Sequence, residues 1–341
     1  MHDGLMNYRI ETEVDVIDTK QWEQYVLNHQ RANIFQTPQM YAVYQGTSNY
    51  QPVVIACFEK NDLKGILLAV IQREYSGLLG KLSARSIIWG GPLADSEAIT
   101  EMILGRYDQE IRKHAIYSQF RNFHVLTDNE KRVFEVHGYA YDPHLNILVD
   151  LPADTDRFWR GIKRNRKDGI NKASRQGFTF FTSDDPEMCG PFYKLLRESY
   201  KRIKLPYPDT DFFSILSSEA SGYSKWFVLK KDELPIIVLL AMVYKETIYA
   251  FYIGTTNDSE LLRLRPVDLF YYQVMCWGIE NGYKRFDWMG AGKPDREYGV
   301  RKFKIQYGGD LLETGRFEKI HKPTTYKVSR FGFRIWQKFR G

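Results

Sequence analysis

Short apolar runs rich in β-branched and aromatic residues alternate along the chain with segments of helical spacing. Residues 247–254 form such a run, which predicts a buried strand. Residues 267–281 repeat apolar side chains three and four positions apart, which predicts a helix; Pro266 and Gly282 mark its two ends. A further strand is expected at 284–289, before a glycine loop. This order places a helix N-terminus beside two strand ends, where folds of this kind hold an anionic donor.

The same plan occurs twice in the chain. A predicted hairpin over 53–58 and 66–73 corresponds to another over 226–229 and 236–244. The repeat distance is about 170 residues, which is the size of a domain rather than of a solenoid repeat. In each half a strand, a helix, a strand and a short helix follow the hairpin. The pattern therefore predicts a tandem duplication of one α/β (α+β) unit with mixed sheets.

The joint between the two copies is expected near Asp150, which gives domains of residues 1–151 and 152–341. A strand over 145–151 is expected to close the first domain. A strand over 121–126 carries His124, which is interpreted as a core or surface histidine rather than a catalyst.

The second copy opens with a basic segment that is expected to be one helix over 155–176. The segment from Arg157 to Arg175 contains eight cationic residues and a single acidic one, Asp168. The cationic residues are Arg157, Arg160, Lys163, Arg164, Arg166, Lys167, Lys172 and Arg175. This charge would attract a phosphate-bearing partner such as tRNA. A solvated helix face explains the same pattern equally well.

The composition indicates a cytoplasmic globular protein. Of the 341 residues, 43% are hydrophobic and 15% aromatic, which is enough for packed cores, and the net charge is only +6. The three cysteines are far apart in apolar or helical settings, which favours buried thiols over disulfides or a thiolate metal site. No apolar run approaches the ~18 residues of a membrane span, and no signal-peptide pattern opens the chain.

Several catalytic motifs are missing from the sequence. It contains no Gly-x-Ser-x-Gly elbow, no His-Glu-x-x-His, no Cys-x-x-Cys and no Walker loop, and its seven histidines lack ligand-like spacing. No metal centre is therefore expected. Acyl transfer to an amine is consistent with the absence of these motifs. It requires an activated donor, an uncharged nitrogen and stabilisation of an oxyanion, but no covalent enzyme intermediate.

Residues 247–309 contain the sequence Arg-Pro-x-Asp-Leu from Arg265, Phe-Asp-x-x-Gly from Phe286 and Phe-Lys-x-x-Tyr-Gly-Gly from Phe303. In this order the motifs resemble the FemABX aminoacyltransferases and their GNAT relatives, often labelled BioF2-like acetyltransferases. Weaker similarity covers most of the chain. The resemblance implies two GNAT-like (acyl-CoA N-acyltransferase-like) domains. It also implies transfer of an acyl or aminoacyl unit onto an amine of a cell-envelope peptide or sugar precursor.

The resemblance selects Lys304 as the first catalytic candidate, because it matches a lysine taken to stabilise charge at the donor ester or the oxyanion. The alternative is a lysine whose stem merely lies on the core. Asp287 could orient Lys304 or accept the amine proton, or it could only cap its loop. Tyr252 could reach the same cleft, although tyrosine is common in strands. The sequence leaves the general base open.

The donor site is expected at the start of the helix that follows Pro266. Acetyl-CoA-binding relatives place a glycine-rich loop here, whereas residues 263–268 contain no glycine. Arg263 and Arg265 are therefore expected to contact donor phosphates through their side chains, with Phe303 in the same site. No permanently bound cofactor is expected. The donor is either an acyl-CoA or an aminoacyl-tRNA, and the missing glycines favour the Fem-type side.

For the acceptor, Gln36 and the helix after it resemble a Fem-type motif that leads to a phosphate-binding lysine. That position is Tyr44 here, which weakens the case for a nucleotide-linked muramyl peptide. Arg202 matches the position of an acceptor-binding arginine in the family.

Two other functions fit the sequence. One is a CoA-dependent N-acetyltransferase that acts on an amino sugar in polysaccharide biosynthesis. The other is a non-catalytic RNA- or anion-binding protein that uses the basic segment.

The tail over residues 326–341 combines apolar residues at helical spacing with five positive charges and no negative one. Such a helix could rest on an anionic membrane surface as a peripheral contact. Docking on its own domain is the other interpretation.

Overall fold

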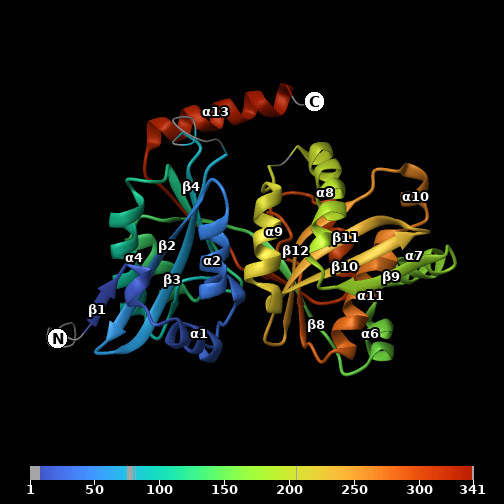
Figure 1. The fold of residues 1–341 in the computed structure, drawn as a ribbon, viewed down its shortest axis with the longest axis horizontal. Helices are drawn as coiled ribbons and strands as arrows, with labels where there is room; N and C mark the ends of the chain where they lie inside the picture. The colour runs from blue at the N-terminus through green and yellow to red at the C-terminus, as the bar shows by residue number, and fades with distance from the viewer. Residues whose placement is uncertain (1–7, 75–79, 81, 205, 340–341) are drawn as a thin grey trace. The chain divides into compact units, whose positions relative to one another are not determined.

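A computed structural model describes residues 8–74, 80, 82–204 and 206–339. The chain divides into two compact units, each with its own mixed sheet (Figure 1). The first unit consists of the chain up to Pro143 together with Glu313–Phe339, and the second contains His144–Leu312.

The first unit holds a sheet in the order β1-β2-β3-β4-β6-β15-β7, with β5 paired to β3. Its elements are β1 (Tyr8–Glu11), η1 (Val14–Val16), α1 (Thr19–Asn28), η2 (Ile34–Gln36), α2 (Pro38–Gly46), β2 (Tyr50–Glu59), β3 (Asp62–Gln72), β4 (Arg85–Trp89), β5 (Leu93–Ala94), α4 (Glu97–Ile111), β6 (Tyr117–Arg121), α5 (Asp128–Val136), β7 (Ala140–Asp142), β15 (Arg316–Ile320) and α13 (Pro323–Phe339).

The second unit holds a sheet in the order β14-β8-β13-β12-β11-β10-β9. Its elements are β8 (Leu145–Asp150), α6 (Thr155–Gly161), α7 (Arg164–Ser174), β9 (Phe178–Ser183), η3 (Pro186–Met188), α8 (Cys189–Ile203), α9 (Thr210–Glu219), η4 (Ser221–Tyr223), β10 (Ser224–Lys231), β11 (Leu234–Tyr244), β12 (Thr247–Thr255), α10 (Ser259–Arg263), α11 (Pro266–Glu280), β13 (Arg285–Asp287), α12 (Gly299–Lys304), η5 (Ile305–Tyr307) and β14 (Asp310–Glu313).

The predicted duplication is confirmed by the order of elements. Each unit contains an antiparallel hairpin, β2–β3 or β10–β11. Each also contains one parallel pair joined by a helix: β4 and β6 flank α4, and β12 and β13 flank α11. The α/β class with mixed sheets is therefore correct.

The two units exchange their closing strands, which the predicted ranges 1–151 and 152–341 did not anticipate. Strand β8 pairs with β13 of the second unit, and β15 pairs with β6 and β7 of the first. The apolar side chains of β8 lie in the second core, whereas Phe317 of β15 lies in the first. An apolar alternation predicts a strand but does not reveal which sheet it joins.

Two local predictions need correction, and a third is confirmed in its backbone. The expected helix over 155–176 is two helices, because Ile162 and Lys163 adopt extended backbone angles and Ile162 is buried in the core. Strand β6 ends at Arg121, so His124 follows the strand instead of lying on it. The tail forms α13, but the side chains of residues 333–341 lie outside the described ones.

Strand β12 is enclosed by helices on both faces. Leu269, Phe270 and Val274 of α11 pack in the second core. Helix α8 packs on β11 and β12 from the other side. The approach is close at Gly254, where an added Cβ atom would lie 2.6 Å from the backbone nitrogen of Leu196. These contacts fix the strand that leads to the candidate site.

Candidate active site

Strands β12 and β13 are neighbours, as predicted, but they pair over only three residues. Their parallel register runs from Thr247 opposite Arg285 to Tyr249 opposite Asp287. Beyond this point β12 continues to Thr255, while the chain leaves β13 for a loop. A register shift in the β11–β12 ladder places a bulge at Phe251. Among the described residues, the edge of β12 beyond Tyr249 therefore has no partner strand on the β13 side.

The loop after β13 is fixed by two buried polar side chains. Met289 and Gly290 have positive φ angles of 57° and 129°. Asn146 of β8 accepts a hydrogen bond from the Gly290 backbone nitrogen at 2.8 Å and donates one to Asp287 at 2.8 Å. The Met289 backbone nitrogen also donates to the Asp287 carboxylate, at 2.7 Å. The loop is therefore held in one unusual conformation before any ligand binds.

Lys304 is the last residue of α12 and reaches this loop. Its Nζ atom donates to the carbonyl oxygens of Trp288 at 3.0 Å and Gly290 at 2.6 Å. The same atom lies 5.4 Å from the centre of the Trp288 ring. Burial lowers the pKa of Lys304 to about 8, although the negative charge of Asp287 opposes the change. An ammonium group has three N–H donors, so the two carbonyls leave one for a substrate atom.

Asp287 is only 2% exposed, and burial raises its pKa. The hydrogen bonds from Asn146 and Met289, and the positive charges of Lys304 and Arg285, act in the opposite direction. The structure thus brings Lys304 and Asp287 to the same loop. The hydrogen bonds of the carboxylate shape the loop, and its charge favours the protonated form of Lys304.

Tyr252 lies in a different environment from Lys304. Its ring packs against Phe213 of α9 at 5.2 Å between centroids, and against Tyr200 of α8 at 6.4 Å. The tyrosine of β12 that stands opposite Asp287 is Tyr249, whose pKa is raised by burial and by the Asp287 charge. The bulge at Phe251 shifts the alternation of side chains along β12 by one residue. It therefore places the Tyr252 ring on the face of the strand that α8 and α9 cover.

The two predicted donor arginines point to different partners. Arg263 lies at the surface and pairs with Glu260 at 2.6 Å. Arg265 has a φ of +66° at the start of α11, and its Nε atom donates to Asp268 at 2.5 Å. Arg265 is therefore tied to the first turn of its own helix, and Arg263 is the more accessible of the two.

Arg166 of α7 belongs to the support of the site, although the sequence indicated only a basic run. This buried guanidinium pairs with Asp268, and its Nε atom donates to the Gln306 side chain at 2.8 Å. It also lies 4.5 Å from the centre of the Phe303 ring. Arg166 thus contacts Phe303 and Gln306, which lie on either side of Lys304 in the sequence. The Phe303 ring also packs against Tyr307.

The predicted acceptor residues do not form one cluster within either unit. Gln36 is fully buried in the first unit. Its side-chain amide nitrogen donates to the carbonyl oxygens of Leu68 and Trp89, and its side-chain oxygen accepts from the Leu68 backbone nitrogen. Tyr44 is also buried, at 3% exposure. Arg202 is exposed on the second unit and donates to Asn257 at 2.8 Å. The contacts of Gln36 join η2 to strands β3 and β4, which is a structural role.

Residues 160–299 match the family model of the acetyltransferase (GNAT) domain. Most of the second unit is therefore similar to a GNAT domain. The match spans α7, α11, β12, β13 and the loop that binds Lys304, and it ends at the start of α12. No curated protein matches the chain in sequence at a significant level.

Solved structures extend this likeness to the whole chain. The crystal structure of FemX shares 14% identity with a TM-score of 0.69, covering 93% of this chain and 99% of FemX. L-PGS from Bacillus licheniformis shares 16% identity with a TM-score of 0.57, covering 92% and 96%. A tandem GNAT protein from the clavulanic acid biosynthesis pathway shares 8% identity with a TM-score of 0.56, covering 92% and 98%. The predicted resemblance to the FemABX and GNAT proteins is therefore confirmed at the level of the fold, and residues 160–299 also resemble an acetyltransferase (GNAT) domain in sequence.

Two further findings concern the described part of the chain. None of its helices combines the length and apolar character required to cross a membrane. Within the same residues, no group of three or more His, Cys, Asp or Glu side chains is arranged to hold a metal ion.

Proposed function

We propose that this protein transfers an acyl or aminoacyl unit onto an amine of a cell-envelope peptide or sugar precursor. The observation that carries the proposal is the position of Lys304. Its partly desolvated ammonium group is fixed on the two carbonyls of the loop, at the point where β12 and β13 separate.

In this proposal the donor lies along β12 beyond Tyr249, where β13 no longer pairs with it. An extended chain can hydrogen-bond to such an edge as an added strand would. The acceptor nitrogen attacks the donor carbonyl carbon, and the carbonyl oxygen becomes an oxyanion. The third N–H of Lys304 donates to that oxygen. Because Lys304 is already oriented by Trp288 and Gly290, little reorganisation is needed as the charge develops. Collapse of the intermediate breaks the bond from the donor carbonyl carbon to the CoA sulfur or the tRNA ribose oxygen. The proton lost by the attacking nitrogen passes to this leaving group, which departs as a thiol or a hydroxyl.

The aminoacyl branch is supported by the fold shared with FemX. A C-terminal domain described as that of a lysylphosphatidylglycerol synthetase, from Agrobacterium fabrum, also shares the fold, with a TM-score of 0.56 at 13% identity. Both names point to acceptors of the cell envelope. Six of the cationic side chains of α6, α7 and their flanks are exposed, and they offer a surface to tRNA: Arg157, Arg160, Lys163, Arg164, Lys172 and Arg175.

A CoA-dependent N-acetyltransferase acting on an amino sugar is the second candidate. The family model that matches residues 160–299 is that of an acetyltransferase, and this favours an acyl-CoA donor. Both donors are made in the cytoplasm, which supports that compartment as the place of action.

A donor experiment tests the proposal. The purified full chain is incubated separately with radiolabelled acetyl-CoA and with radiolabelled aminoacyl-tRNA, each with a mixture of envelope precursors. Transfer of label to an amine supports the acyltransferase, and the donor that is used selects between the branches. Binding of tRNA without transfer from either donor would instead favour the non-catalytic alternative.

A further inference from the structure

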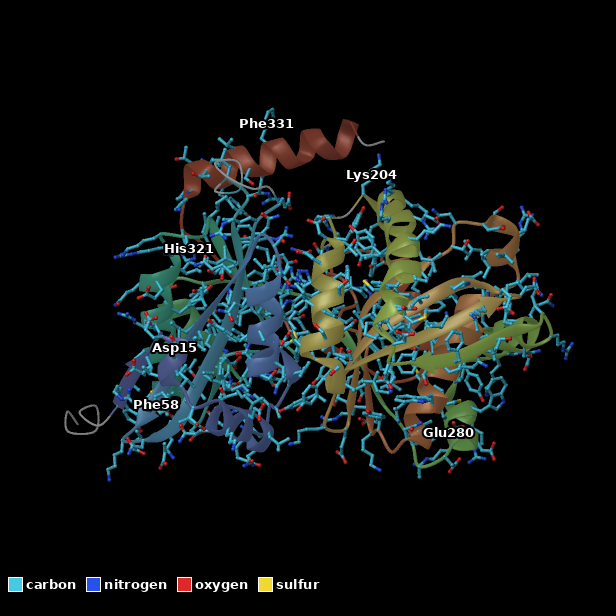
Figure 2. All side chains as sticks on the ribbon, viewed as in Figure 1. Asp15, Phe58, Lys204, Glu280, His321 and Phe331 are labelled. Atoms are coloured by element: carbon cyan, nitrogen blue, oxygen red, sulfur yellow. The ribbon has the colours of Figure 1, made fainter. Side chains whose placement is uncertain are left out.

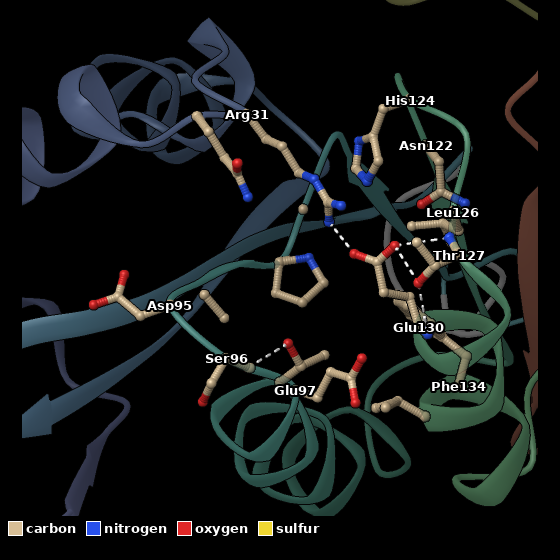
Figure 3. A pocket seen from close by; sticks show the side chains of 16 residues that line it. Arg31, Asp95, Ser96, Glu97, Asn122, His124, Leu126, Thr127, Glu130 and Phe134 are labelled. Carbon is tan, nitrogen blue, oxygen red and sulfur yellow. Dashed lines mark hydrogen bonds and ion pairs between the residues drawn. The ribbon is translucent and has the colours of Figure 1, made fainter.

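The first unit contains a cavity of about 280 Å³ that the proposed acyl transfer does not use. Figure 3 shows it between the start of α4 and the start of α5, with Arg31 and His124 in the upper part of the view. Pro92, Leu126 and Phe134 give it an apolar lining, and polar side chains surround that lining. This is the composition of a site for a small organic molecule.

His124 presents an unused polar atom in this cavity. Its Nε2 atom is shielded from solvent and has no hydrogen-bond partner among the described residues. Burial, followed by the positive charge of Arg31, lowers the pKa of His124 to about 4, so the imidazole is neutral. A buried polar atom without a partner is costly, and a ligand that supplies the partner recovers that cost.

The charges around the cavity select the kind of ligand. Asp95, Glu97 and Glu130 line it together with a single cation, Arg31. Arg31 is already paired with Glu130, and the other oxygen of Glu130 accepts from the Thr127 backbone nitrogen at 2.8 Å in a capping box. Asp95 accepts from the Tyr25 hydroxyl at 3.0 Å and lies 4.0 Å from the Lys64 ammonium group. Among the described residues, Glu97 is therefore the lining carboxylate without a cation beside it, and it makes the site negative. Such a site repels phosphate and attracts an ammonium group.

The position of this cavity sharpens the contrast with the second unit. Helix α4 follows β4 as α11 follows β12. The residues before and at the start of α4 include Asp95 and Glu97, where the corresponding part of the second unit carries Arg263 and Arg265. Those arginines are paired with Glu260 and Asp268, whereas Glu97 has no counterion among the described residues, which indicates different ligands.

We propose that the first unit holds a second ligand site, for a small amine carried as its ammonium ion on a partly apolar body. The ammonium group lies beside Glu97, and the body of the ligand lies over Pro92 and Phe134. A polar group of the ligand bonds to His124 Nε2. This site is independent of the acyl donor.

Calorimetric titration of the full chain with matched probes tests the site. The amines are glucosamine and L-alaninamide, and their uncharged counterparts are N-acetylglucosamine and N-acetyl-L-alaninamide. We expect at least one amine to bind saturably and its N-acetyl counterpart to bind at least tenfold more weakly. Glu97→Gln should weaken the amine about tenfold. Glu101→Gln is the control, since Glu101 is exposed one turn further along α4 and does not line the cavity.

A second readout locates the binding. The ring proton signals of His124, assigned from the His124→Gln variant, should shift on addition of the amine. The proposal is overturned if neither amine binds, if Glu97→Gln and Glu101→Gln behave alike, or if the His124 signals do not move. It is also overturned if inorganic phosphate or CoA shifts those signals more strongly than the amines do.

Discussion

The Nζ atom of Lys304 lies 2.6 Å from the carbonyl oxygen of Gly290. The backbone nitrogen of the same glycine is held by Asn146 of β8. The glycine therefore links a lysine on α12 to a strand more than a hundred residues earlier in the chain. The orientation of Lys304 depends on this loop as much as on its own helix.

Replacement of Lys304 by methionine should slow transfer at least tenfold, which corresponds to about 1.4 kcal/mol of transition-state stabilisation. Methionine keeps the apolar stem and removes the N–H donors. The measurement is kcat with the donor identified by the transfer assay, together with the circular dichroism of the variant.

Lys302→Met is the matched control for this variant. Lys302 is on the same helix, is 67% exposed in its side chain and pairs with Glu297. Its variant should retain its turnover. Equal rates for Lys304→Met and the wild type would mean that Lys304 only covers the core.

The rate should fall as the pH rises above about 8, because the pKa of Lys304 is about 8 and only its protonated form donates to an oxyanion. Removing the Asp287 charge lowers that pKa further, so Asp287→Asn should move the falling limb of kcat/KM to lower pH. Asparagine retains an oxygen to accept from Asn146 and Met289. A rate that rises through pH 8 would instead identify Lys304 as a general base.

The same pKa predicts a dependence of stability on pH. A lysine whose pKa is lowered by folding binds fewer protons in the folded state between about pH 8 and its ordinary pKa of 10.5. The free energy of unfolding should therefore rise with pH across this window. Urea titrations at several pH values measure this slope. The contribution of Lys304 is the part of the slope that disappears in Lys304→Met.

Arg166→Met should destabilise the second unit by about 3 kcal/mol, because it leaves part of a buried ion pair uncompensated. Among the described residues, Asp268 would retain only Arg265 as an ion-pair partner. The variant also frees Gln306 and Phe303, so the rate at saturating donor should fall as well. Arg164→Met is the exposed control on the same helix, and its unfolding curve should coincide with that of the wild type.

The exposed cations of α6 and α7 separate the two donors. We expect the combined variant Arg160→Ala, Arg164→Ala and Arg175→Ala to bind tRNA several-fold more weakly, with a reduced dependence on salt, because phosphate contacts release counterions. Acetyl-CoA turnover should be unaffected. Filter binding at several salt concentrations measures the first effect, and an unchanged salt slope would remove tRNA from this surface.

The sequence predicted the individual helices and strands better than it predicted which strands pair with one another. Residues 247–255 and 266–280 form the expected strand and helix, because β-branched runs and capping residues are local signals. The assignment of β8 to the second sheet was missed, since its apolar side chains fit either core. The break between α6 and α7 at Ile162 was missed because this single apolar residue lies in a run of charged ones, and the sequence does not show that its side chain is buried.

The site was predicted in part, for a similar reason. Lys304 and Asp287 stand in recognisable motifs, and in the structure both side chains bond to the backbone of the loop after β13. Asn146 supports the same loop from far away in the sequence, and its only signal was a polar residue inside an otherwise apolar strand. Arg166 could not be told from its charged neighbours, because only the packing of α7 on α11 shows which arginine is buried.

Helix α13 is attached to the first unit at its first turns and exposes apolar residues further on. The Tyr326 ring packs edge-on against Tyr117 at 5.4 Å, and its hydroxyl donates to Glu318 at 2.8 Å. Val328 is 60% exposed and Phe331 is 66% exposed, and Figure 2 shows Phe331 on the outer side of the helix. We therefore propose that the helix both docks and serves as a peripheral membrane contact.

These two roles depend on different residues, so they can be tested separately. Val328→Asp with Phe331→Asp should reduce binding to phosphatidylglycerol vesicles at least tenfold and leave the unfolding transition unchanged, because burial of one such side chain contributes about 1.5–3 kcal/mol. Tyr326→Ala should lower the midpoint of thermal unfolding, because it removes the contact with Tyr117 and the bond to Glu318. Vesicle sedimentation at low and high salt measures the first effect, since Lys327 and Arg330 add an electrostatic component. If the wild type fails to sediment with these vesicles, or if the double aspartate variant sediments equally well, the exposed face does not bind a membrane and α13 serves the first unit alone.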